Sequence, residues 1–262
     1  MSIKNFVKAV APSPVWEYLR RKKAKINTLL ALRGYMKSSS MEGFIILDDA
    51  KEYGKTGKIF GGEQYYSQAY QDYFLDRSIF RGKEGGFFLD IGGNDPVRIN
   101  NTYFFEKSRG WSGLAFEPLA SQRGKWDSLR KIECLPFALG SVESEAEFCE
   151  YEDDVMSGFS DEVRYSGKVK ARYKVPVRRL TGILEERGIK HVDFVSLDVE
   201  GAEIEVLKGI DFSRVDIECF TIENDKGLKK GQRIRKFMTE AGYKIKARLW
   251  LDEVWIKDRV QA

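Results

Sequence analysis

The chain of 262 residues contains three cysteines, one histidine and no long hydrophobic run. The cysteines, Cys134, Cys149 and Cys219, lack CxxC spacing, so we expect isolated thiols rather than a disulfide framework. No apolar run approaches the length of a membrane span, and the N-terminus lacks the apolar core of a signal peptide. These absences together favour a cytoplasmic protein.

An excess of either charge sign is also missing, because 44 basic residues stand against 40 acidic ones. This balance argues against nucleic acid as the main partner. Hydrophobic residues make up 42% of the chain, which is enough for a real core, and the length suits one large domain with an extension. We place a helical extension and glycine-containing linker at 1–62 and the main domain at 63–262.

The N-terminal extension carries a basic cluster at residues 20–23, close to Trp16. A basic helix with a tryptophan can rest on an anionic membrane surface, so peripheral membrane contact is one interpretation. The other is a helix packed on the main domain with its basic face in water. The sequence leaves both open.

The stretch 85–117 organises the main domain, because it has the pattern and length of a βαβ unit. Its first apolar run ends at Asp90 and is followed by Gly92 and Gly93, and its second apolar run ends at Glu117. Ligands of parallel sheets bind beyond the carboxyl ends of the strands, and glycines there allow a ligand to approach the backbone. We therefore expect a ligand site at this edge.

The residue types at this edge favour a nucleoside with a positive charge. Glu117 stands where a carboxylate accepts the ribose hydroxyls in dinucleotide folds. The G-x-G-x-x-G signature of a pyrophosphate site is absent, and Asp90 would repel a pyrophosphate. S-adenosylmethionine, which carries a sulfonium and an ammonium group, fits better than a nicotinamide dinucleotide. An ordinary α/β turn with solvated acids is the alternative.

Two more apolar runs, 194–197 and 217–222, also end on acids, at Asp198 and Glu223. Parallel strands end at a common edge, so these acids are expected to share one crevice with Asp90 and Glu117. A further strand over 132–139 would bring Ala138 to the same edge, beside an adenine ring. The polar stretch 152–173 is expected to be a loop or lid that leads into a half-exposed basic strand. The remaining patterns predict helices over 67–80, 100–107 and 119–129, and a terminal hairpin over 243–250 and 254–257.

These segments resemble the FkbM-type methyltransferase family over about residues 65 to 258. The resemblance is carried by GGFFLDIGGND, NNTYFFEKSRGWSGLAFEP and DFVSLDVEGAEIEVLKGID, with SLDVEGAE the most specific piece. It implies an α/β, Rossmann-like class I methyltransferase fold, with a mostly parallel seven-stranded sheet, an antiparallel last strand and helices on both faces. It also implies S-adenosylmethionine-dependent O-methyl transfer to a hydroxyl of a small molecule or glycan, of sugar or polyketide type.

The resemblance assigns roles to individual residues. Asp90, Gly92 and Asn94 would border the methionine part of the cofactor, Glu117 would hold the ribose, and Asp198 would lie near the transferred methyl group. The complete set expected to bind the cofactor is Asp90, Gly92, Gly93, Asn94, Asn100, Thr102, Glu117, Pro118, Ala138 and Asp198.

Methyl transfer to a hydroxyl needs a group that removes the proton. The sole histidine, His191, precedes its strand on the far side of the sheet, so the base is expected to be a carboxylate, a lysine or a metal-bound group. Asp198 is the first choice among these. By analogy with sugar O-methyltransferases of similar topology, Mg²⁺ held by Glu200, Glu223 and Asn224 is a second expectation. The alternative is that Glu200 caps the next helix and Glu223 binds water or a backbone amide.

One residue departs from the family pattern. Pro96 stands where the family usually has glycine, and proline fixes φ and removes an amide donor. A catalytically impaired binding protein with a methyltransferase fold is therefore an alternative. A nicotinamide-dependent oxidoreductase and a glycosyltransferase-associated binding module are two others.

Overall fold

The computed structural model describes residues 43–45, 58–60, 62–153, 157–159, 167–224 and 228–259. These residues belong to a compact unit of residues 42–262, which begins before the boundary predicted at residue 62. The predicted N-terminal helix and its membrane contact lie outside the described residues. The boundary itself stays a prediction.

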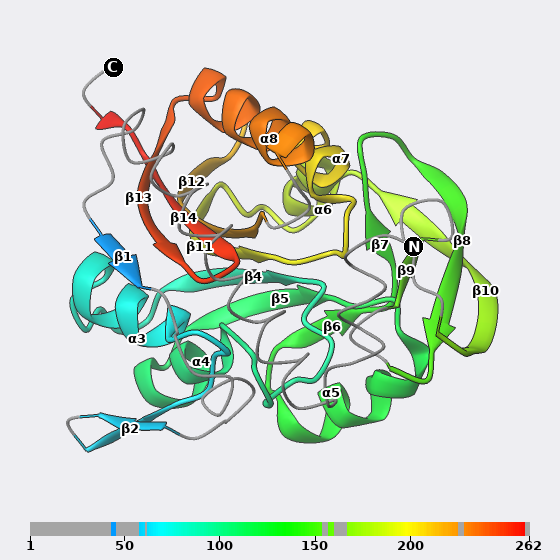
Figure 1. Cartoon of the computed structure of the whole chain (residues 1–262), viewed down its shortest axis with the longest axis horizontal. Helices are drawn as coiled ribbons and strands as arrows, with labels where there is room; N and C mark the ends of the chain where they lie inside the picture. Colours follow the sequence, from blue (N-terminus) through cyan, green and yellow to red (C-terminus); the bar gives the residue numbers. More distant parts are fainter. Residues whose placement is uncertain are drawn as a thin grey trace, which may run out of the picture. The chain divides into compact units, whose positions relative to one another are not determined.

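The described residues form an α/β fold on a mixed sheet of eight strands, in the order β1-β13-β14-β12-β11-β4-β5-β6 (Figure 1). β14 runs antiparallel to both of its neighbours, and every other neighbouring pair in this sheet is parallel. The α/β class is therefore confirmed. The count differs from the predicted seven, because β1 comes from the stretch predicted as linker and adds an edge strand. The strands are β1 (Gly43–Ile45), β4 (Phe87–Ile91), β5 (Ser112–Phe116), β6 (Glu133–Leu135), β11 (His191–Leu197), β12 (Asp216–Glu223), β13 (Tyr243–Leu249) and β14 (Asp252–Lys257).

Helices cover both faces of this sheet. Figure 1 shows α3, α4 and α5 on one side and α6, α7 and α8 on the other. Aromatic side chains fill the first interface, where the ring of Phe105 on α4 lies 5.7 Å from Phe194 on β11 and 4.8 Å from Trp111, measured between ring centroids. None of the described helices is both long and apolar enough to cross a membrane. The helices are α3 (Gln71–Phe74), which continues as the π-helical turn η1 (Leu75–Ile79), α4 (Tyr103–Arg109), the 3₁₀ turn η2 (Ala120–Gln122) with α5 (Arg123–Leu129), α6 (Leu180–Glu186), α7 (Glu203–Lys208) and α8 (Leu228–Glu240).

Two predicted helices begin too early in the chain. Tyr70 adopts a left-handed φ of 63°, so α3 begins after it rather than at residue 67. The side-chain Oδ1 of Asn100 accepts hydrogen bonds from the amides of Thr102 and Tyr103, both at 2.9 Å. This local bonding holds Asn100 outside the helix, as asparagine does at helix starts.

The predicted strand over 132–139 is wrong as a single element. β6 ends at Leu135, and β7 (Ala138–Leu139) belongs to a second sheet with the order β7-β10-β8-β9. Pro136 lies between them and has no amide to donate to a ladder, which ends the pairing of β6. The second sheet also contains β8 (Ser144–Tyr151), β9 (Gly158–Phe159) and β10 (Val169–Arg178), so the described part of the predicted lid is partly strand.

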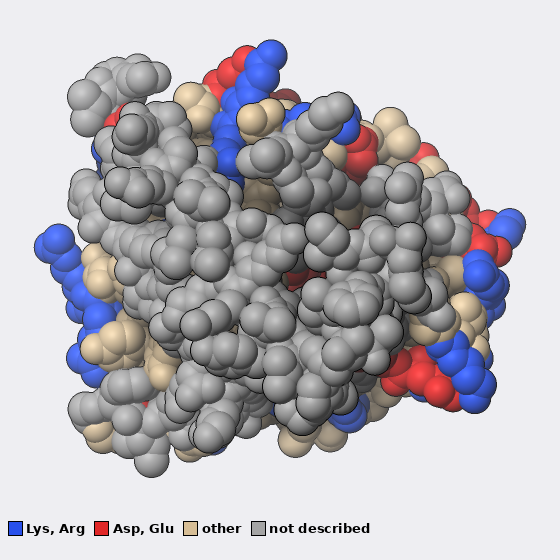
Figure 2. All heavy atoms as spheres, viewed as in Figure 1, with Lys and Arg blue, Asp and Glu red and all other residues tan. Residues whose placement is uncertain are grey.

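The basic face of β10 pairs with acids on β8. Lys170 contacts Glu150, and Arg172 bonds Glu147 at 2.9 Å. Lysine, arginine and acidic side chains accordingly lie together over this flank in Figure 2. This cross-strand pairing supports a solvated strand face over a site for phosphate. A small hairpin of β2 (Lys58–Phe60) and β3 (Glu63–Tyr65) completes the described strands.

Candidate functional site

A cavity of about 600 Å³ lies at the carboxyl ends of β4, β5, β11 and β12. Its volume falls within the range of small-molecule sites. The structure brings most of the predicted site residues together around it. The predicted residues that line the cavity are Asp90, Gly92, Gly93, Asn94, Asn100, Glu117, Pro118, Ala138, Asp198, Glu200 and Glu223.

Two predicted site residues do not line this cavity. Thr102 is fully buried, and its hydroxyl donates to Oδ2 of Asp90 at 2.6 Å. Nδ2 of Asn224 donates to Oε2 of Glu253 at 2.8 Å and to the carbonyl of Gly231 at 3.3 Å. Both residues support their neighbours rather than face a ligand.

The predicted Mg²⁺ ligands therefore do not converge as a set. Carboxylate oxygens of Asp198, Glu203 and Glu223 lie within 4.8 Å of one another, but Glu200 is not in this group. Asn224 does not line the cavity, and its side-chain amide is bonded to Glu253. The metal prediction gains no support. Ala202 occupies the N-cap position of α7, and the alternative role of Glu200 as a cap stays a prediction.

The glycines after β4 are required by the protein itself. Gly92 has a φ of +78°, and a Cβ there would lie 1.8 Å from the carbonyl oxygen of Asp198. A Cβ on Gly93 would lie 2.7 Å from both Oδ1 of Asp90 and the ring of Trp126. Close packing of backbone and side chains, rather than the approach of a ligand, explains these two positions.

Asp90, at the end of β4, is committed to an internal network. Its Oδ2 accepts from Nδ2 of Asn100 at 2.9 Å and from the hydroxyl of Thr102. Nη1 of Arg130 lies 3.9 Å from the same oxygen. Burial raises the pKa of Asp90, while Arg130 and the two hydrogen bonds oppose this rise.

Glu117, at the end of β5, is held in place by two backbone amides. Its Oε2 accepts from the amide of Asn94 and its Oε1 from the amide of Leu119, both at 2.7 Å. Asn94 takes a left-handed φ of 44°, which turns its amide toward the carboxylate. The loop after β4 and the loop after β5 are thereby tied together at the cavity wall.

Asp198, at the end of β11, has the opposite surroundings. It lines the cavity, and its accessible surface is the surface open to that cavity. The surrounding protein removes it from bulk water, and this loss of hydration, reinforced by the charges of Glu223, Glu200 and Asp252, raises the pKa of Asp198 well above its ordinary value.

Sequence reasoning missed Asp252 and Gln71, which line the same end of the cavity. Oδ2 of Asp252 accepts from Nε2 of Gln71 at 2.7 Å. Asp252 is the first residue of β14. Because β14 runs antiparallel to β12, it begins at the edge of the sheet where β12 ends. The predicted reversal of the last strand was therefore a usable signal.

Sequence reasoning also missed Asn101, Phe148 and Phe159, which line the cavity too. Nδ2 of Asn101 donates to the hydroxyl of Ser196 at 3.0 Å, and its Oδ1 is buried without a hydrogen-bond partner among the described residues. A buried acceptor of this kind suits a ligand that donates a hydrogen bond. Phe148 and Phe159 come from the second sheet. No spacing of residues in the sequence predicts that these two side chains lie at the cavity.

His191 lies where the sequence predicts, at the amino end of β11. It is exposed, and its Nδ1 lies 3.0 Å from Oδ2 of Asp216. It does not line the cavity, so it is not the base.

The fold and the cavity define an α/β protein with a cavity of small-molecule size at the carboxyl edge of its sheet. The sequence profile described as Methyltransferase FkbM domain matches residues 90–245, which is more than half of the chain. The chain belongs to the FkbM methyltransferase domain family.

Two further comparisons add little. The crystal structure of methyltransferase FkbM from Methylobacillus flagellatus KT is similar over 73% of this chain and 48% of that one, with 12% identity and a TM-score of 0.46. This chain thus spans about half the length of that protein. A search of curated proteins finds no match.

Proposed function

We propose that this protein is an S-adenosylmethionine-dependent O-methyltransferase that acts on a hydroxyl of a small molecule or glycan. One observation carries the proposal: in a chain of a methyltransferase family, the acids at the ends of four strands, Asp90, Glu117, Asp198 and Glu223, line a single cavity.

The residues present fit this cofactor. Glu117 would hold the ribose hydroxyls, and its fixed carboxylate is oriented by the amides of Asn94 and Leu119. The buried Oδ1 of Asn101 is an acceptor for the amino group of the methionine part. The apolar side chains of Leu119 and Ala138 and the aromatic rings of Phe148 and Phe159 line the cavity and suit adenine.

Asp198 would act as the base toward the acceptor. The cofactor supplies an electrophilic methyl group on a sulfonium. A carboxylate with an ordinary pKa is a poor match for a hydroxyl proton, and a raised pKa brings the carboxylate closer to the value a general base needs. Loss of hydration, followed by the charges of Glu223 and Glu200, raises the pKa of Asp198 and so favours this role.

The charge of the cavity limits the acceptor. Four of the lining residues at the Asp198 end are carboxylates: Asp198, Glu200, Glu223 and Asp252. Arg98, which is exposed, is the one basic residue among the described lining residues. An acceptor with phosphate or carboxylate groups next to its hydroxyl would be repelled, so we propose a neutral or cationic hydroxyl compound.

An impaired protein is less well supported. Asp95 accepts from the amides of Val97 at 3.1 Å and Arg98 at 2.8 Å, and the carbonyl of Pro96 accepts from Nη1 of Arg130 at 2.9 Å. Proline is well suited to such a turn, because the turn uses the amides after it. Pro96 is thus compatible with a well-formed cofactor loop.

Calorimetric titration with S-adenosylhomocysteine tests the proposal, with NADH as the competing ligand. We expect heat of binding with the first ligand and none with the second. Glu117→Ala removes the ribose contact and should weaken binding of S-adenosylhomocysteine. Absence of heat up to millimolar S-adenosylhomocysteine would refute the cofactor assignment, and binding of NADH would favour an oxidoreductase.

A further inference from the structure

We propose that Arg130 is a positioning residue, which holds the loop of residues 94–102 in the shape that receives the amino acid part of the cofactor. This inference rests on the function proposed above. Arg130 follows α5, its side chain is completely buried, and it does not line the cavity. Its influence must therefore pass through the residues that it contacts.

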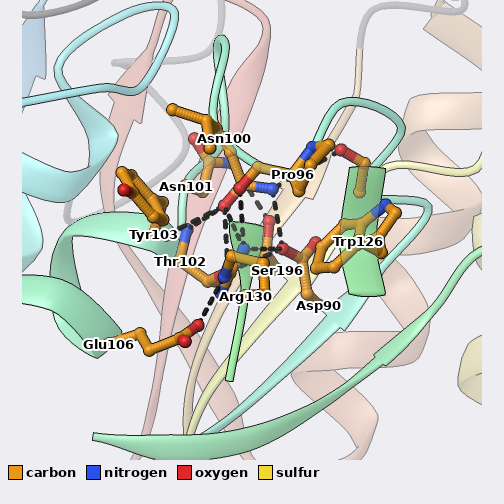
Figure 3. A network of polar contacts seen from close by, with 12 residues as sticks. Asp90, Pro96, Asn100, Asn101, Thr102, Tyr103, Glu106, Trp126, Arg130 and Ser196 are labelled. Atoms are coloured by element: carbon orange, nitrogen blue, oxygen red, sulfur yellow. Dashed lines mark hydrogen bonds and ion pairs between the residues drawn. The ribbon is translucent and has the colours of Figure 1, made fainter. Parts of the chain in front are cut away.

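The guanidinium of Arg130 contacts the loop at several points (Figure 3). Nη1 donates to the carbonyl of Pro96 at 2.9 Å and lies 3.3 Å from Oδ1 of Asn100, and Nη2 donates to the hydroxyl of Thr102 at 3.0 Å. The Nε donates to the carboxylate of Glu106 on α4. One planar group thus fixes both ends of the loop and the start of the next helix, which lysine cannot do with a single ammonium.

Aromatic rings hold the guanidinium itself in place. Its central carbon lies 4.9 Å from the ring centroid of Trp126 and 5.5 Å from that of Tyr103. Trp126 adds a second anchor, because its Nε1 donates to the carbonyl of Asn94 at 2.8 Å. The carbonyls of Asn94 and Pro96 are therefore both held from the α5 side, away from the cavity.

These anchors determine how the loop meets the cavity. Oδ1 of Asn100 accepts from the amides of Thr102 and Tyr103 and from Arg130, so its Nδ2 is directed to Asp90. If Arg130 were removed, the carboxylates of Asp90 and Glu106 would lose the positive charge that they share. The side-chain amide of Asn100 would lose one of the hydrogen bonds that orient it. The disturbance would reach Asp90, Asn100 and Asn101 on the cavity wall.

The other end of the cofactor site depends less on Arg130. Oε1 of Glu117 accepts from the amide of Leu119, which lies outside the loop, and Ala138 belongs to the second sheet. Arg130 bonds the loop at Pro96, Asn100 and Thr102 rather than at Asn94, whose amide donates to Oε2 of Glu117. Loss of Arg130 should therefore weaken recognition of the amino acid part while leaving recognition of the nucleoside largely intact. That contrast separates positioning from general destabilisation.

The test uses Arg130→Lys and two probes, S-adenosylhomocysteine and methylthioadenosine, which lacks the amino acid part. We expect Arg130→Lys to weaken binding of S-adenosylhomocysteine about tenfold and to change binding of methylthioadenosine by less than about twofold. Arg187→Lys is the matched control, because Arg187 forms a surface ion pair with Glu133 at 2.8 Å. It should change neither affinity.

Thr102→Val keeps the inference testable if Arg130→Lys folds poorly. It removes the hydroxyl that accepts from Nη2 of Arg130 and donates to Asp90, and it leaves the contact between Asn94 and Glu117 in place. It should show the same selective loss, at a smaller size. Equal weakening of both probes, or of neither, would overturn the positioning role. Failure of the unmodified protein to bind S-adenosylhomocysteine would instead overturn the cofactor assignment, and the inference with it.

Discussion

The two ends of the cavity place an aspartate in opposite electrostatic surroundings. Asp90, at the loop end, has Arg130, Asn100 and Thr102 around its carboxylate. Asp198, at the acidic end, is surrounded by further carboxylates. Loss of hydration inside the protein raises the pKa of both, but at the loop end the neighbours oppose the rise, whereas at the acidic end they increase it.

The difference separates the structural end of the site from the reactive end. A buried charge with a hydrogen-bonded counter-charge stabilises one arrangement of the chain around it, and removal of its partner is costly. A carboxylate held among like charges costs stability, which is the usual condition of a group with a chemical role. The following predictions test this division.

Asp198→Asn should have the largest effect, on methyl transfer. Loss of the base should lower turnover about 10²–10⁴-fold, since general base catalysis contributes that much. Product formation, followed by mass spectrometry with neutral hydroxyl compounds, measures the loss, and affinity for S-adenosylhomocysteine should change little. Asp127→Asn, on the exposed face of α5, is the matched control. Undiminished turnover in Asp198→Asn would rule out the base.

Arg130→Met should lower the free energy of unfolding by about 3–5 kcal/mol, because it leaves Asp90 and Glu106 buried without their counter-charge. Asp198→Asn should leave the free energy of unfolding unchanged or raise it, because it relieves repulsion among carboxylates. Denaturant unfolding of both variants measures the contrast. Similar losses in the two variants would remove the distinction between the ends.

The pH dependence of stability should show the strain at Asp198. A carboxyl group with a raised pKa in the folded protein binds its proton more tightly when folded, so it contributes stability at low pH. That contribution is lost as pH rises from the ordinary pKa, near 3.8, through the higher folded value. The melting temperature of Asp198→Asn should therefore gain on the unmodified protein as pH rises above 4. A constant difference would contradict the raised pKa.

Pro96→Gly should have the smallest effect. Glycine increases the freedom of the unfolded chain and should lower the free energy of unfolding by about 0.4–1 kcal/mol. Since the Pro96 carbonyl bonds Arg130 in a well-formed turn, cofactor affinity should stay equal or fall slightly. Thermal unfolding and calorimetry measure both. Tighter binding in the variant would show that proline impairs the loop.

Much of the sheet and part of the cavity wall could be predicted from the sequence. Short apolar runs that end on Asp90, Glu117, Asp198 and Glu223 mark buried parallel strands, and the topology of such strands alone places their ends together. The reversed terminal hairpin is also predicted, over 243–250 and 254–257, and the structure places β13 and β14 there.

The remainder depends on contacts between distant segments. Whether Asp90 faces a ligand or Arg130 is decided by packing against α5, 40 residues further along the chain, and local patterns do not report it. Phe159 reaches the cavity from β9 of the second sheet, and the pairing of β9 with β8 has no short-range signal in the sequence. Asn224 follows β12, which ends at Glu223 as the sequence predicts. Its side chain nevertheless bonds Glu253 on the neighbouring strand β14.

A crystal structure with S-adenosylhomocysteine bound tests the central claim most directly. We predict that the ribose hydroxyls contact Glu117, the amino acid part lies beside Asn100 and Asn101, and the sulfur faces Asp198. A ligand bound outside this cavity, or in the reverse orientation with its amino acid part against Leu119 and Phe159, would contradict the account.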